Sequence, residues 1–203
     1  MAVTLTPMTL GELKTEVRTL VGDFASLSTA FNDQTVIASI NFAVEHFFKA
    51  TGKSYTEAEL TKSGSTFPLP NSYIMVARAG YKPTGGSNTW LLNTTIGEET
   101  NRNPDWQTLV GTPKRWMIFD GAKIRLTPNP TSGTCVIGYV EEPTRMVNDA
   151  DVVDSRIPVP YQRFLKYAAA AWLFEIDGDT QDMAVAANHF ALFTEFIKEV
   201  VIQ

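Results

Sequence analysis

The sequence predicts an α+β fold, in which helices from both ends of the chain form a bundle and an antiparallel β-rich region is inserted between them. Apolar residues recur with helical spacing near each end, and short β-prone runs separated by turn residues fill the middle. The composition supports a core, because 44% of the 203 residues are hydrophobic and 19% are charged. We expect a single domain over 1–203, with a helical body at 9–52 and 156–203 and a β-rich insertion at 53–147.

The first two helices are predicted from apolar stripes with capping residues at their ends. Thr9 and Glu12 have the spacing of a capping box, in which each side chain bonds the backbone N–H of the other residue. Asn32 or Asp33 is expected to cap the second helix, and Gly52 to end it. The stripe of this second helix contains Val36, Ile37, Ile40, Val44, Phe47 and Phe48.

The middle of the chain is expected to form a small antiparallel sheet or sandwich. The clearest hairpin joins Trp116–Phe119 to Lys123–Leu126, because Asp120-Gly121 supplies the two positive φ angles that a tight two-residue turn requires. A further strand is expected at Cys135–Tyr139. The polar run near 85–107 is expected to be a long exposed loop.

Two more helices are predicted in the last third. The first runs from about Tyr161 to Ile176, and its small residues Ala168–Ala171 allow another helix to approach closely. A turn at Asp177–Asp179 leads to a last helix that reaches nearly to Gln203. The apolar side of this helix is expected to contain Met183, Ala187, Phe190, Phe193, Ile197 and Val200.

No residue pattern selects a catalytic, metal or cofactor site. His46 and His189 are the only histidines, and no CxxC or HExxH spacing accompanies them. The single Cys135 lies in a strand pattern and is expected to be a small buried hydrophobe. The aspartates within 149–154 and 177–182 are interpreted as helix caps and not as metal ligands. We therefore expect a protein that is not an enzyme and that has no metal and no cofactor.

Net charge and hydropathy disfavour two further classes of protein, which are nucleic-acid-binding proteins and membrane proteins. The net charge of −5 and the pI near 5.1 disfavour a protein that grips nucleic acid tightly. Residues 1–8 lack a secretory pattern, and no run approaches the roughly 20 apolar residues of a membrane helix, so we expect synthesis in the cytoplasm and no membrane partner.

Basic residues gather around the predicted hairpin, whereas the stretch from Asp177 onward is acidic. These could be two solvated faces, or they could meet across a subunit contact, or the basic hairpin could face phosphates. The candidate interface residues are Lys114, Arg115, Trp116, Lys123, Arg125, Phe193 and Phe196.

The order of these segments resembles a known family. "VIASINFAVEHFFKATG" is followed by "STFPLPNSY", then by "GTPKRWMIFDGAKIRLTPNPTSGTCVIGYVEEPTRM", and finally by "IPVPYQRFLKYAAAAWLFEIDGDTQDMAVAANHFALFTEFIKEVV". This succession, from about Asp33 to Val201, resembles the head-to-tail adaptor (connector) proteins of tailed bacteriophages.

The resemblance implies a structural virion protein at the head–tail junction. It implies a homo-oligomeric ring of about twelve copies beneath the portal, which links the capsid to a tail tube, nozzle or other tail protein. It also implies that genomic DNA passes through the ring without sequence-specific binding. The alternative is a β-rich module of a phage tail that binds a carbohydrate or another ligand, with Trp90, Trp106 and Trp116 as stacking residues. An enzyme with an unrecognised site is a third hypothesis.

Overall fold

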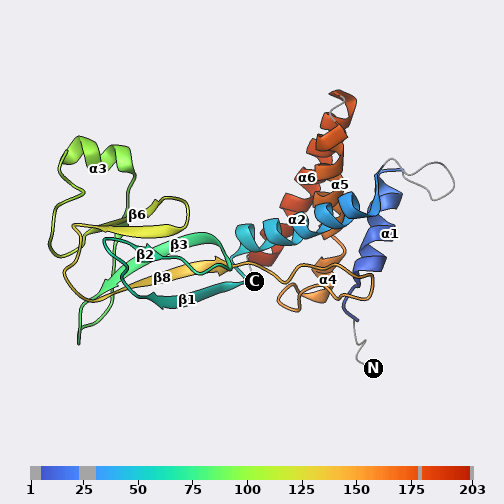
Figure 1. The fold of residues 1–203 in the computed structure, drawn as a ribbon. Helices are drawn as coiled ribbons and strands as arrows, with labels where there is room; N and C mark the ends of the chain where they lie inside the picture. Colours follow the sequence, from blue (N-terminus) through green and yellow to red (C-terminus); the bar gives the residue numbers. More distant parts are fainter. Residues whose placement is uncertain (1–5, 23–30, 178–179, 202–203) are drawn as a thin grey trace. The chain divides into compact units, whose positions relative to one another are not determined.

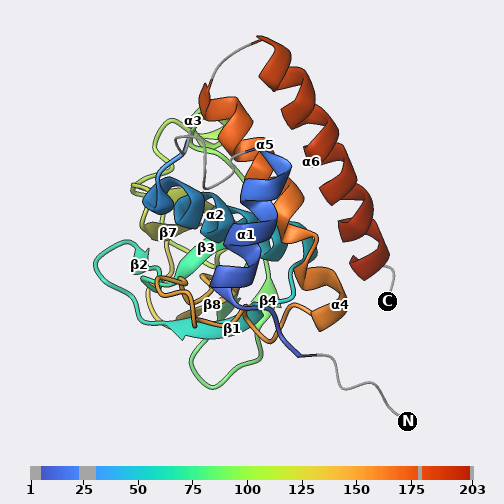
Figure 2. The same ribbon diagram turned by 90° about the vertical axis from the view of Figure 1, so that its right-hand side faces the viewer.

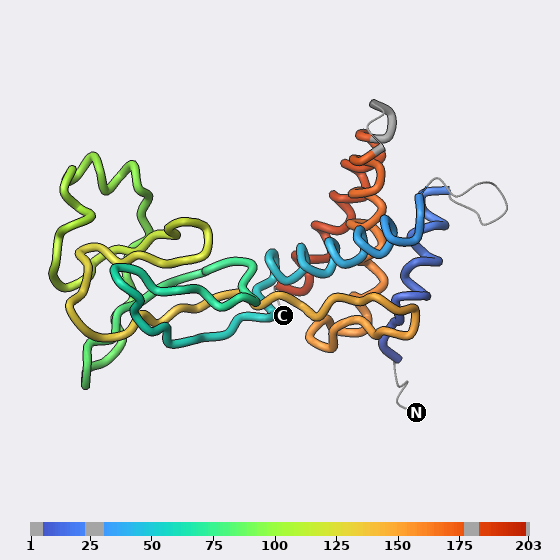
Figure 3. Tube along the Cα trace, in the orientation of Figure 1, coloured from blue at the N-terminus to red at the C-terminus, as the bar shows by residue number. Residues whose placement is uncertain are grey.

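The fold combines a helical unit with a β-unit, in a computed structural model that describes residues 6–22, 31–177 and 180–201. The helical unit combines residues 1–54 and 143–203, and the β-unit is the continuous segment 55–142 (Figure 1). Figure 3 shows how the chain enters the β-unit after the second helix and later returns to helices. The α+β prediction, with a β region inserted between terminal helices, is confirmed. That the two units act as one domain stays a prediction.

The helical unit is built around one central helix. Its helices are α1 (Leu10–Leu20), α2 (Asp33–Thr51), α4 (Val159–Gln162), α5 (Leu165–Asp177) and α6 (Thr180–Val201). Helix α5 packs against α1, α2 and α6 (Figure 2). Ala168–Ala171 are all buried, so small side chains do bring the neighbouring helices close to α5, as the sequence predicts.

The predicted N-terminal caps are confirmed. Thr9 and Glu12 form a reciprocal capping box, and the side chain of Asn32 accepts a hydrogen bond from the backbone N–H of Thr35. Gly52 ends α2 with a left-handed φ of 64°. Local sequence therefore defines the start of α1 and both ends of α2.

The interpretation of the aspartates near residue 150 as carboxylate caps is wrong. Backbone carbonyls bond the start of α1, since the Leu10 and Gly11 N–H groups donate to the carbonyls of Asp151 (2.8 Å) and Asp149 (3.0 Å). The carboxylate of Asp151 instead accepts from two N–H groups of its own loop, which lowers its pKa. The carboxylate of Asp149 pairs with Lys14 at 3.0 Å. A loop distant in sequence thus supplies the cap, which local reasoning could not reveal.

The C-terminal helices differ from the prediction in two respects. The expected helix from Tyr161 to Ile176 is broken into α4 and α5, because the N–H groups of Phe164 and Tyr167 bond carbonyls three residues earlier. On α6 the expected apolar side is right in its second half, where three residues are buried, and wrong at Met183 and Ala187, which are exposed. The three buried residues are Phe193, Ile197 and Val200. The turn expected at Asp177–Asp179 lies largely outside the described residues.

The β-unit is a sandwich of two four-stranded sheets, in the orders β1-β8-β3-β4 and β2-β7-β6-β5. All strand pairs are antiparallel except β5 with β6. Side chains of both sheets pack into one core. The elements are β1 (Tyr55–Leu60), β2 (Phe67–Pro68), β3 (Tyr73–Lys82), β4 (Thr89–Trp90), β5 (Leu92–Asn93), α3 (Ile96–Arg102), β6 (Arg115–Phe119), β7 (Lys123–Thr127) and β8 (Thr134–Glu141).

The β-unit confirms the positions of the predicted strands and corrects the length of the hairpin turn. Phe119 pairs with Lys123, so the turn holds three residues and not the expected two, although Asp120 and Gly121 have the predicted positive φ angles. Strand β8 pairs with β1 and β3 and not with the hairpin. The region 85–107, expected to be an irregular loop, contains β4, β5 and α3. Cys135 is buried in the core, as expected, and burial raises its pKa to about 12.

In the part of the chain that the structure describes, the helices are too short or too polar to span a bilayer.

Candidate functional site

The two arginines of the hairpin, which are candidate interface residues, bind other residues of the β-unit itself. Arg115 donates from Nε to Glu99 Oε1 at 2.6 Å, and Arg102 reaches the same oxygen at 2.6 Å. The Thr94 hydroxyl donates to this carboxylate at 3.1 Å. Glu99 is only 1% exposed. The role of Arg115 within the unit is thus to hold α3 on the outer face of the sheet β2-β7-β6-β5.

Electrostatics at Glu99 favour the ionised form. Burial raises the pKa of this carboxyl, but the hydrogen bonds from Arg115 and Thr94 outweigh burial and leave the pKa below its usual value. Glu99 therefore stays charged at neutral pH.

Arg125 lies deeper than Arg115, with 6% of its surface exposed. Its guanidinium lies 4.9 Å from the centre of the Trp106 ring and 5.4 Å from that of Phe119, and it donates to the carbonyl of Gln107. Burial lowers the pKa of Arg125. Because aromatic faces attract cations, this contact fixes the segment that follows α3 against the sheet.

The other hairpin candidates divide between surface and core. Lys114 is exposed, and Lys123 pairs with Asp120 at 3.2 Å near the turn. Trp116 is buried in the core of the sandwich. The exposed positive charge of the hairpin is thus on its two lysines, and Lys123 is balanced by Asp120.

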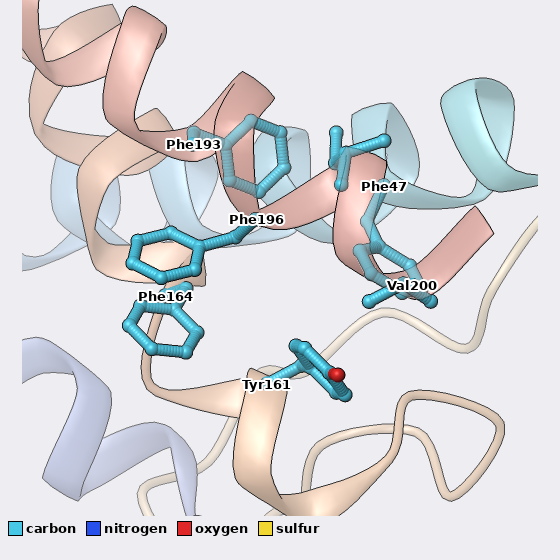
Figure 4. A pocket seen from close by; sticks show the side chains of 7 residues that line it. Phe47, Tyr161, Phe164, Phe193, Phe196 and Val200 are labelled. Atoms are coloured by element: carbon cyan, nitrogen blue, oxygen red, sulfur yellow. The ribbon is translucent and has the colours of Figure 1, made fainter. Parts of the chain in front are cut away.

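Phe193 and Phe196, the remaining candidates, lie on α6 in the helical unit. Phe193 is buried, whereas Phe196 is half-buried and stacks on Phe164. Both line a small apolar hollow with Tyr161 and Phe47 (Figure 4). Its free space is about that of one water molecule, so it cannot hold a larger ligand.

Both histidines pack among aromatic rings of the helical unit. His46 stacks on Phe42 and meets the edge of Phe190, and His189 lies between Tyr167 and Phe174. Burial lowers the pKa of each, and for His46 the nearby Lys49 lowers it further. Both histidines are therefore packing residues of the helical unit.

These histidines should make the stability of the helical unit depend on pH. Because their pKa values are lower in the fold than in the unfolded chain, the unfolded state binds more protons, and stability should fall as pH drops below about 6.5. Urea midpoints followed by helical circular dichroism should be lower at pH 5.5 than at pH 7.5. The double variant His46→Gln, His189→Gln should lose this difference, and a wild-type midpoint that is equal at both pH values would contradict the assignment.

The three tryptophans proposed as stacking residues differ in access. Trp106 and Trp116 are buried. Trp90 is 39% exposed, but the Arg78 guanidinium lies 3.9 Å from the centre of its ring. Among the described residues, no group of three or more His, Cys, Asp or Glu side chains is placed to hold a metal ion.

Sequence reasoning missed Glu99, and it missed Arg78 with the side chains that contact it, which are Tyr55, Glu57 and Trp90. Glu99 directly follows the capping box of α3, in which Thr95 and Glu98 bond each other, and that signal could have identified the helix. The alternation of Tyr55, Glu57 and Glu59 could have identified an outward strand face.

Comparison with known proteins identifies the family. No curated protein matches the chain. The family model described as SU10 adaptor protein matches residues 8–203. This match spans both the helical unit and the β-unit. The chain therefore belongs to the SU10 adaptor protein family, a family of phage head-to-tail adaptors, as the resemblance in its sequence had suggested.

Proposed function

We propose that the protein forms a closed ring of about twelve copies beneath the portal and links the capsid to the tail. The family match over nearly the whole chain carries this proposal. A ring needs a head-to-tail contact between two different surfaces of one chain. A helical unit and a β-unit with separate cores offer such different surfaces. Portal and tail proteins are the partners on either side, and the protein is a component of the virion.

The distribution of charge supports a ring that DNA can traverse. Residues 55–142 contain eight basic and eight acidic residues, so the whole net charge of −5 belongs to the helical unit. A negative surface repels phosphates, and DNA that is not held can slide during ejection. We propose that the helical unit lines the channel, and that Lys114 and Lys123 of the β-unit contact neighbouring proteins.

The ring predicts a large assembly in solution. Light scattering and negative-stain images of the purified protein, alone and mixed with the portal protein, should show a ring of about twelve copies in at least one of the two samples. A protein that stays monomeric alone and also fails to bind the portal would contradict the proposal. A glycan array tests the alternative carbohydrate-binding role, for which Trp90 is the exposed candidate.

A further inference from the structure

The two outer faces of the β sandwich differ in whether another segment of the β-unit packs on them. The face of β2-β7-β6-β5 lies under α3 and the segment after it, through the Glu99–Arg115 and Trp106–Arg125 contacts. Figure 1 shows α3 beyond β6, on the side of the β-unit opposite β1 and β8. On the outer face of β1-β8-β3-β4, large side chains are about 40% exposed. They are Tyr55, Met75 and Trp90.

The register places these side chains together on the exposed face. Tyr55 pairs with Val140, Arg78 with Gly138, and Trp90 with Gly80. The alternate residues of β8 face the sandwich core, so the partners named here face outward. Gly138 forms the floor, because a Cβ atom at this position would lie 1.9 Å from the hydroxyl of Tyr55.

Arg78 organises the exposed face. Its guanidinium lies over the rings of Trp90 and Tyr55, at 3.9 Å and 5.5 Å. It also donates to the hydroxyl of Tyr55 and to Glu57, both at 2.7 Å. Tyr, Trp, Arg and Met are enriched at protein interfaces, and rings that are already held lose little entropy on binding.

The charges of this face cancel in pairs. Arg78 pairs with Glu57, and Lys82 pairs with Glu59 at 2.5 Å. The face therefore has no net charge, so it lacks the positive surface that attracts nucleic acid and the unbalanced charge that attracts a charged peptide.

Helix α6 presents such a surface. From Met183 to Thr194 it contains no acidic residue, lysine or arginine, and its titratable His189 packs between two rings with a lowered pKa. Met183 is 58% exposed and Leu192 45%. Between them, Ala184, Ala187 and Ala191 are exposed. Figure 2 shows α6 beside α5, at the margin of the helical unit. An exposed helical stretch that displays mainly alanine, methionine and leucine and no charged residue is typical of a contact surface.

We propose that the outer face of β1-β8-β3-β4 in one copy binds the outward face of α6 in a second copy. Among the described residues of each unit, no helix covers this sheet face and no further layer covers the outward side of α6, and neither surface carries a net charge. The contact joins two different surfaces of one chain, so it repeats head to tail and can close a ring. The inference rests on the proposed function, because it names the contact from which the ring is built.

Charged substitutions on either surface test the contact. Ala187→Glu on α6 and Met75→Glu on β3 should each raise the concentration for half-maximal assembly by about tenfold or more, since each buries an unpaired carboxylate. Two controls place the same charge on other exposed positions. The controls are Ala38→Glu on α2 and Ile118→Glu on β6, and both variant proteins should assemble like wild type. Mass photometry reads out the assembly, and circular dichroism verifies folding.

Cross-linking identifies the two surfaces directly. A mixture of Met75→Cys protein and Ala187→Cys protein, treated with a flexible bismaleimide, should give heterodimers, while buried Cys135 should not react. The chain carrying both cysteines should give a ladder of multimers. Homodimers of Ala187→Cys in place of heterodimers, or a double variant that links only within its own chain, would overturn the proposal.

The outcomes separate this contact from the proposed function. If wild-type protein forms rings, both glutamate variants form them equally well and no heterodimer appears, the contact is wrong and the ring stands. If wild-type protein stays monomeric and also fails to bind the portal, both fall.

Discussion

Replacing Glu99 with alanine should release the segment 96–107 from the β sandwich. The change leaves Arg115 half-enclosed without its carboxylate and removes one end of the contact that holds α3. Loss of one partner from a buried ion pair costs roughly 3 kcal/mol or more, and we expect the lower end because Arg102 and Arg115 are partly exposed. Hydrogen exchange should show faster exchange of the α3 amides, and urea should unfold the β-unit at a lower concentration.

The neighbouring Asp105 provides the control for this prediction. It is an exposed acid in the same segment, so Asp105→Ala should change the free energy of unfolding by about 0.5 kcal/mol or less. If the amide hydrogens of α3 exchanged at the same rate in the Glu99→Ala and Asp105→Ala variants, the Glu99–Arg115 pair would not be what holds the helix.

Replacing Phe193 with alanine should destabilise the helical unit strongly. Phe193 is 1% exposed and packs against His46 and Phe190, so its removal leaves a cavity between α6 and α2. Truncation of a buried phenylalanine costs about 3–5 kcal/mol. Urea unfolding, followed by circular dichroism and by Trp172, the single tryptophan of this unit, should show the loss.

Leu192 provides the control for this prediction, because it is adjacent to Phe193 in the sequence but is 45% exposed. Leu192→Ala should keep the free energy of unfolding within about 1 kcal/mol of wild type. Equal losses of stability in the two variants would show that Phe193 is not a core residue of the unit.

Helix caps and apolar stripes could be predicted because they depend on neighbouring residues. Thr9, Asn32 and Gly52 act as expected, since a cap bonds a backbone group three or four positions away. The cap that the Asp149–Asp151 carbonyls add to α1 joins segments about 140 residues apart. Such a contact leaves no local pattern.

The surroundings of the candidate interface residues were harder to predict, because a charged residue has the same appearance in sequence whether it faces water or another layer. Arg115 and Arg125 seemed a basic surface, and their partners Glu99 and Trp106 lay in a segment expected to be a loop. The sequence alone could not show that Trp90 lies outside the sandwich and Trp116 inside it. What separates them is the register of strands, which places one outside the sandwich and the other inside.

The strands at the margins of the two sheets have a consequence for solubility. Marginal strands expose unpaired backbone groups that can recruit further strands without limit, which is how amyloid grows. Strands β2, β4 and β5 have only two residues each, and the longer β1 carries Glu57 and Glu59. These short or charged margins leave little backbone on which a further strand could add, so they protect the β-unit from fibrous aggregation.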